Sequence, residues 1–181
     1  LEDHFRIKLC GKIGPGQKDT ELKMLKRRIQ FSGNGYFYYP NPVHAMPLIE
    51  KIVPGGAKPA LTPGTKETVN NLGTAEDELD PGEAAEFQSG AGTLLYHSLD
   101  DLRVQYASGV IMSGMYKPRV VDQARLVRAV RYLKDAPIVA WRFAFQKPPY
   151  KLYSLADADH AGDVETHRST SSQHLFLSGH L

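Results

Sequence analysis

The first forty residues contain two runs of apolar positions that are separated by a turn sequence. Leu25 and Ile29 are the apolar anchors of an extended segment, and residues 36–39 (YFYY) form a second, aromatic run. Between the two runs, residues 32–35 (SGNG) include the Asn-Gly pair that is typical of tight hairpin turns. The pattern therefore predicts a β-hairpin over residues 24–39.

The middle of the chain carries helix-start signals in front of amphipathic segments. Asn41 is predicted to cap a first helix, which Pro47 is expected either to kink or to delay. Asp80 is followed by Pro81 and, three residues after the cap, by Glu83, which is the arrangement of a capping box. The second helix is predicted to run from there to about residue 97, and two more cover about 101–113 and 120–134.

Three short apolar runs after residue 135 predict strands. They cover residues 138–145, 150–155 and 173–177. Because strands near both ends of the chain enclose a run of helices, the sequence predicts an α+β fold.

Composition narrows the classes of protein to which the chain can belong. Of its 181 residues 41% are hydrophobic, so a core is feasible and wholesale disorder is not expected. The single cysteine excludes an internal disulfide and fits a reducing compartment. No stretch approaches the ~18 consecutive apolar residues of a membrane span, so no membrane partner is expected. The chain starts at Leu1 rather than Met, and both ends are expected to be cuts through a longer protein.

The net charge is only +2, but the basic residues are clustered. One cluster lies in the predicted hairpin, and another lies on the last predicted helix, on a different face from its apolar residues. The candidate phosphate-binding residues in these clusters are Lys26, Arg27, Arg28, Arg125, Arg128 and Arg131. Such residues can contact nucleic-acid phosphates, although a solvated helix face is the commoner explanation of a basic run on a helix.

Four blocks in the first 135 residues follow the order of one known family. Residues 24–29 (MLKRRI) resemble that family's YLGLEI strand, and residues 57–63 (AKPALTP) resemble its CKPVSTP stretch. Residues 87–96 (FQSGAGTLLY) are similar to its helix YRSLVGSLLY, and residues 129–134 (AVRYLK) are similar to ILRYLK. The family is the copia-type reverse transcriptase of long terminal repeat retrotransposons.

A further block near the end of the chain resembles the start of that family's RNase H. Residues 156–163 (ADADHAGD) and 168–171 (RSTS) are similar to the family pattern SDADWAGD followed by RSTSG. The chain departs from the pattern at His160, where the family has Trp, and at Leu102, where a Pro is expected. With this block the resemblance covers nearly the whole chain.

The resemblance implies a division of the chain and a role for each part. Residues 1–60 would be the end of the reverse transcriptase palm with a primer-grip-like hairpin, 61–135 a helical thumb or connection, and 136–181 the first part of an RNase H-like domain. The chain would position an RNA–DNA hybrid or DNA, as part of a larger Pol polyprotein. The parent would copy RNA and degrade the RNA of the hybrid in a cytoplasmic virus-like particle, with nuclear access possible.

Asp157 is the predicted catalytic and metal-binding residue. By resemblance it lies on the first RNase H strand, where it helps to hold catalytic Mg²⁺, and carboxylate oxygens are the ligands that this ion prefers. Two-metal phosphodiester hydrolysis needs several such groups, and the family's other acidic ligands would lie beyond Leu181. The chain is therefore expected to supply one metal ligand and to be inactive alone. Without the resemblance, a turn with solvated acids is the commoner explanation of this acidic run.

Two alternatives bear on function. The pair Asp100-Asp101 follows Tyr96 as in a polymerase YxDD box, but the tyrosine is two residues too early, so Asp100 is predicted to cap a helix instead. The second alternative is a different class of protein, namely a non-enzymatic nucleic-acid-binding or structural remnant of a decayed element. The departures at His160 and Leu102 favour such a decayed copy.

Overall fold

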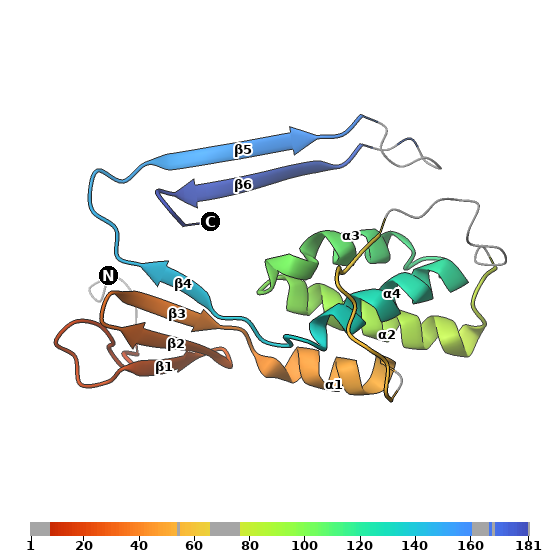
Figure 1. The fold of residues 1–181 in the computed structure, drawn as a ribbon, viewed down its shortest axis with the longest axis horizontal. Helices are drawn as coiled ribbons and strands as arrows, with labels where there is room; N and C mark the ends of the chain where they lie inside the picture. Colours follow the sequence, from red (N-terminus) through yellow and green to blue (C-terminus); the bar gives the residue numbers. More distant parts are fainter. Residues whose placement is uncertain (1–7, 54, 66–76, 161–166, 168, 181) are drawn as a thin grey trace.

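The fold is α+β, as the sequence predicts, with a four-stranded sheet, a helical bundle and a two-stranded ribbon (Figure 1). The computed structural model describes residues 8–53, 55–65, 77–160, 167 and 169–180. The sheet has the antiparallel order β1 (Glu21–Met24), β2 (Arg27–Ser32), β3 (Gly35–Tyr39) and β4 (Trp141–Ala144). The last strand comes from far along the chain and pairs with β3.

The predicted hairpin is confirmed, but the structure adds a strand to it. Strands β2 and β3 pair in antiparallel fashion across the turn between Ser32 and Gly35. The segment before Arg27, expected to continue the same strand, instead folds back as β1. Leu25 and Lys26 form the two-residue turn, with φ angles of 50° and 64°, as turns of this length require. Leu25 is 77% exposed, so its predicted role as an apolar anchor is wrong.

The helical bundle consists of α1 (Pro42–Ile52), α2 (Pro81–Ser98), the short 3-10 helix η3 (Leu102–Val104), α3 (Gln105–Ser113) and α4 (Val120–Leu133). Helix α1 begins directly after its predicted cap, Asn41, and runs past Pro47, so the proline does not delay its start. The capping box of α2 is present, because Asp80 accepts from the Glu83 amide and Glu83 accepts from the Asp80 amide.

The core lies among the four α-helices. The predicted apolar face of α4 is confirmed, since Leu126, Val130 and Leu133 are fully buried. They pack with residues of α2 and α3 that include Phe87, Leu94 and Ile111. Burial of one such side chain contributes roughly 1.5–3 kcal/mol. Among the described residues no helix is long and apolar enough to cross a membrane.

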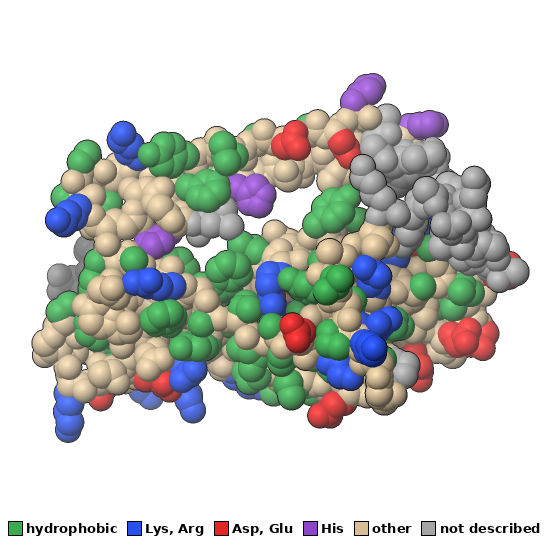
Figure 2. All heavy atoms as spheres, viewed as in Figure 1, with side chains coloured by type: hydrophobic (Ala, Val, Ile, Leu, Met, Phe, Trp, Pro, Cys, Tyr) green, Lys and Arg blue, Asp and Glu red, His purple; other side chains and the backbone are tan. Residues whose placement is uncertain are grey.

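The ribbon is formed by β5 (Leu152–Ala158) and β6 (Ser171–Leu177), which pair with each other in antiparallel fashion. All seven residues of β5 are exposed, and Figure 2 shows open space between much of the ribbon and the rest of the molecule. At its base, Gln146 Nε2 donates to the Leu177 carbonyl oxygen, and His180 Nε2 donates to that of Ala144. The predicted strands 150–155 and 173–177 are therefore present with shifted ends, whereas 138–145 shortens to β4.

Candidate nucleic-acid interface

The turn between β1 and β2 presents lysine side chains to solvent. Lys26 lies in the turn and Lys23 lies on β1, and both are exposed. His44 and Tyr96 belong to the adjoining helical surface, with their ring centroids 4.6 Å apart. Burial lowers the pKa of His44, and the charges of His97, Lys26 and Arg27 lower it further, so His44 is neutral at pH 7. The positive charge at this edge therefore comes from the lysines. We call Lys23 and Lys26 the hairpin lysines.

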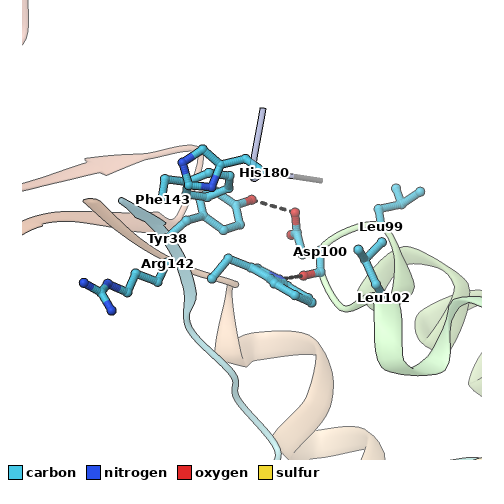
Figure 3. A pocket seen from close by; sticks show the side chains of 9 residues that line it. Tyr38, Leu99, Asp100, Leu102, Arg142, Phe143 and His180 are labelled. Carbon is cyan, nitrogen blue, oxygen red and sulfur yellow. Dashed lines mark hydrogen bonds between the residues drawn. The ribbon is translucent and has the colours of Figure 1, made fainter. Parts of the chain in front are cut away.

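The next basic residue, Arg27, joins the sheet to the helical bundle. Its Nε lies 2.8 Å from Asp100 Oδ2 and 3.1 Å from Asp100 Oδ1. Tyr38 Oη donates to Asp100 Oδ1 over 2.6 Å, and Trp141 Nε1 donates to the Asp100 backbone oxygen over 2.7 Å (Figure 3). These four residues, which we call the Asp100 junction, tie strands β2, β3 and β4 to the turn after α2.

Electrostatics favour the junction at neutral pH. Burial raises the pKa of Tyr38 to about 12, with a further contribution from its hydrogen bond to Asp100, so the hydroxyl keeps its proton. The hydrogen bond to Asp100 also raises the pKa of Arg27. The side chains of Arg27 and Asp100 are only 17% and 12% exposed, which limits screening by solvent. Asp100 is thus a bridge between parts of the fold, and the predicted role as a helix cap is wrong. Its neighbour Asp101 caps η3.

Arg28 is also occupied within the sheet. Its Nη1 lies 3.2 Å from Glu21 Oε2 on the neighbouring strand. Its guanidinium lies over the ring of Tyr39, 3.8 Å from the centroid, in a cation–π arrangement. Of the three basic residues predicted on the hairpin, Lys26 is exposed, whereas Arg27 and Arg28 are half-buried and have partners within the chain. The sequence contains no local signal for these pairings.

The basic face of α4 is covered in part by the segment that follows α1. Arg128 Nη2 donates to Thr62 Oγ1, Arg131 Nε to the Lys58 carbonyl oxygen, and Lys134 Nζ to the Ala57 carbonyl oxygen, over 2.8–3.0 Å. The Ala60 amide donates in return to the Arg131 carbonyl oxygen. We call residues 57–62 the strap. These three cations are half-buried and hold the strap against α4, so each has a partner within the chain.

Arg125 has a different partner within α4. Its Nη1 lies 2.8 Å from Oδ1 of Asp122, whose side chain is 1% exposed. Asp122 also accepts from the Arg119 amide at the start of the helix. This predicted nucleic-acid residue therefore neutralises a buried carboxylate, which would be costly to leave unpaired.

A second buried acid lies next to the junction. The side chain of Asp101 is fully buried and lies 2.6 Å from Arg103 Nη2 and 3.4 Å from His97 Nε2. Burial by itself would raise the pKa of Asp101, but His97 and Arg103 outweigh it and hold the pKa well below its usual range. Arg103 also donates to the Ala136 carbonyl oxygen, so this pair anchors the segment after α4. Sequence analysis missed this cluster, although an acid two residues before an arginine at a helix start was a usable signal.

Asp157, the predicted metal ligand, is the next-to-last residue of β5 and pairs with Ser172 on β6. It is exposed, and β5 extends through it rather than ending before it. Within the part of the chain that the structure describes, no three His, Cys, Asp or Glu side chains are grouped so that they could hold a metal ion. Residues 161–166 and 168 of the RNase H-like block lie outside the described residues.

Comparisons with known proteins give one informative relative. No family model matches the chain, and no solved structure gives a significant match. An uncharacterized mitochondrial protein of Arabidopsis thaliana is 29% identical over 120 residues, which are 66% of this chain and 48% of that protein. The chain therefore spans about half the length of that relative. The relative's name states no activity, so this similarity does not assign a function to the chain.

Proposed function

We propose that this chain is part of a copia-type retrotransposon polyprotein, from late reverse transcriptase into RNase H, and that it positions an RNA–DNA hybrid. What supports the proposal is the ordered set of family-like blocks together with the exposed hairpin lysines on a sheet that is tied to a helical bundle. A rigid hairpin with cations at its edge is suited to hold a nucleic-acid backbone. Phosphate contacts of this kind position a duplex without reading its sequence.

The contacts within the chain rank the candidate residues. Lys23 and Lys26 are exposed and would meet phosphates directly. Arg27 and Arg28 would act indirectly, because Asp100 and Tyr39 occupy them and they keep the hairpin in place. Asp122 engages Arg125, and the strap engages Arg128 and Arg131, so duplex contact at those two arginines would require the strap to move. The hairpin lysines are therefore the proposed primary contact.

The proposed role in positioning an RNA–DNA hybrid also implies partners for the chain. The rest of the polyprotein would supply polymerase catalysis and the further acidic residues of the RNase H site, in a cytoplasmic particle. Asp157 would be one ligand for Mg²⁺, which supplies charge stabilisation at the phosphodiester when it is bound. Because a single carboxylate cannot hold the ions, this chain alone should not cleave a hybrid in the presence of Mg²⁺. Clear turnover would contradict this assignment of Asp157.

A gel-shift titration on an RNA–DNA hybrid tests the positioning role. The wild-type chain should bind at low salt, and the logarithm of its affinity should fall linearly with the logarithm of salt concentration. The double variant Lys23→Gln, Lys26→Gln should bind more weakly, with a salt slope smaller by about one unit for each lost phosphate contact. A matched control is Lys51→Gln, Lys147→Gln, which removes two exposed lysines from other surfaces.

The outcomes separate three situations. A smaller slope in the hairpin variant alone supports the proposal, whereas an equal effect in the control means that only overall charge matters. No shift by the wild-type chain at low salt would remove the positioning role altogether. The alternative function is a non-enzymatic remnant, which the departures from the family pattern at His160 and Leu102 favour. The flanking reading frame decides between the two, because in-frame catalytic acids on both sides indicate an enzyme and stop codons indicate a remnant.

A further inference from the structure

A pocket of about 460 Å³ lies where the sheet, the helical bundle and the end of the ribbon meet. Figure 3 shows the rings of Tyr38, Phe143 and His180 grouped on one side and Leu99 and Leu102 on the other. The rings of Phe143 and His180 meet edge to face, with centroids 5.4 Å apart. The volume falls within the range of ~300–1,000 Å³ that is usual for small-ligand sites.

Both walls of the pocket are apolar at the opening. Phe143 and Leu99 are exposed by 38% and 63%, so both sides of the opening present apolar surface that a ligand could cover. Trp141, a member of the Asp100 junction, also lines the pocket. Aromatic side chains of this kind stack on planar heteroaromatic rings, and this stacking tolerates any nucleobase because each has a π-face.

The hydrogen-bonding groups of the walls are selective. The Tyr38 hydroxyl and the Trp141 indole N–H already donate to Asp100, so neither is left to donate to a ligand. His180 Nε2 lies 2.7 Å from the Ala144 carbonyl oxygen and donates to it, so this N–H is not left for a ligand either. The Asp100 carboxylate has further lone pairs and adds acceptor capacity. The pocket therefore presents acceptors and favours a ring that carries a donor.

We propose that this pocket binds an unpaired nucleobase that carries an exocyclic amino group, such as adenine. The inference rests on the proposed nucleic-acid function and deepens it by adding a base-binding site to the phosphate contacts. Arg142 lies at the rim, and Figure 3 shows its guanidinium directed away from the rings, outside the group that encloses the pocket.

The chain carries its own reporter for the test, because Trp141 is its single tryptophan. Adenosine 5′-monophosphate should change the tryptophan emission in a saturable way. Uridine 5′-monophosphate should bind more weakly, because its base lacks the amino group and its one ring N–H lies between two carbonyl oxygens, which the Asp100 carboxylate repels. Ribose 5-phosphate, which has the phosphate and no base, should give no saturable change. Equal effects of the adenine and uracil nucleotides overturn the amino-group assignment, and an equal effect of ribose 5-phosphate overturns the base site in favour of an anion site.

Two wall variants locate the binding. Phe143→Leu removes one ring but keeps an apolar side chain, and Leu99→Ala shortens the opposite wall. Phe143→Leu should weaken adenosine 5′-monophosphate binding by about fivefold or more, the lower limit for loss of a stacking contact. Leu99→Ala should also weaken binding measurably, because it removes apolar contact with the base. The control is Tyr116→Ala, which removes a 98% exposed aromatic side chain that does not line the pocket and should leave binding unchanged. Because Leu99 is largely exposed, Leu99→Ala should fold normally even if Phe143→Leu unfolds partly. Unchanged binding in both variants overturns the proposal.

The test also distinguishes this inference from the proposed function. Salt-sensitive binding of the hybrid without any response to adenosine 5′-monophosphate removes the pocket and keeps duplex positioning. A saturable nucleotide response without hybrid binding supports the base-binding pocket and contradicts the duplex-positioning role.

Discussion

The Asp100 junction makes a quantitative prediction about how the sheet is held to the helical bundle. Asp100→Ala removes the acceptor of Arg27 Nε and of the Tyr38 hydroxyl, while the backbone oxygen that accepts from Trp141 remains. A hydrogen bond to a charged group contributes about 1.5–3 kcal/mol. The two bonds share one carboxylate and are not independent, so the free energy of unfolding should fall by about 2–4 kcal/mol. This is a large part of the stability of an ordinary domain.

Urea unfolding measures this loss, followed by tryptophan emission for the junction and by far-ultraviolet circular dichroism for the helices. In the native state of the variant, Trp141 emission should move toward that of an exposed indole. A double-mutant cycle with Arg27→Met should give a coupling energy of about 1–3 kcal/mol. Asp135→Ala, which removes an exposed carboxylate on another surface, should change stability by less than about 0.5 kcal/mol. If Asp100→Ala behaves like this control and the coupling is near zero, the carboxylate does not hold the junction.

Three further predictions follow from named contacts. An ultraviolet titration of the nine tyrosines should show a step at high pH that belongs to Tyr38. Because folding raises the pKa of Tyr38 from 10.0 to about 12, the free energy of unfolding should fall as pH rises across that interval. Tyr38→Phe should abolish this high-pH step. The pKa of Asp101 is lowered in the fold, so its contribution to the free energy of unfolding is present above the ordinary pKa of 3.8 and is lost as pH falls below it. When urea unfolding is measured from pH 6 downward, the free energy of unfolding of Asp101→Asn should fall less steeply with pH than that of the wild-type chain. An equally steep fall would refute the linkage. Gly35→Ala should lower the thermal midpoint by the equivalent of about 1–3 kcal/mol, because the added Cβ would overlap the backbone of Phe143 on β4, and a neutral effect would mean that β3 and β4 do not pair as described.

Local sequence signals predicted the elements of this fold well. The turn at residues 32–35, the capping box at Asp80 and the apolar face of α4 all appear where the sequence placed them. Each signal depends on residues within one or two turns of the chain, where spacing alone decides which side chains meet. The turn at Leu25 and Lys26 was missed because neither residue is a usual left-handed turn residue.

The partners of the charged residues could not be read from spacing. Arg27 lies 73 residues from Asp100 in sequence, and Arg131 lies 73 residues from Lys58. Periodicity shows that a cation is on a polar face, but it does not show which distant acceptor packs against that face. The interpretations as a phosphate track or a solvated face were therefore the only ones open to sequence reasoning for α4.

Local propensity and residue order specify most of the helices and strands, the apolar face of α4 and the family-like blocks. The tertiary structure decided which basic residues remain exposed, since Asp100, Asp122, Tyr39 and the strap occupy the arginines and leave Lys23 and Lys26 in solvent. It also brought β4 beside β3 and so created the pocket at Trp141. Such contacts join residues far apart along the chain, and their geometry exists only once the helices and strands have packed.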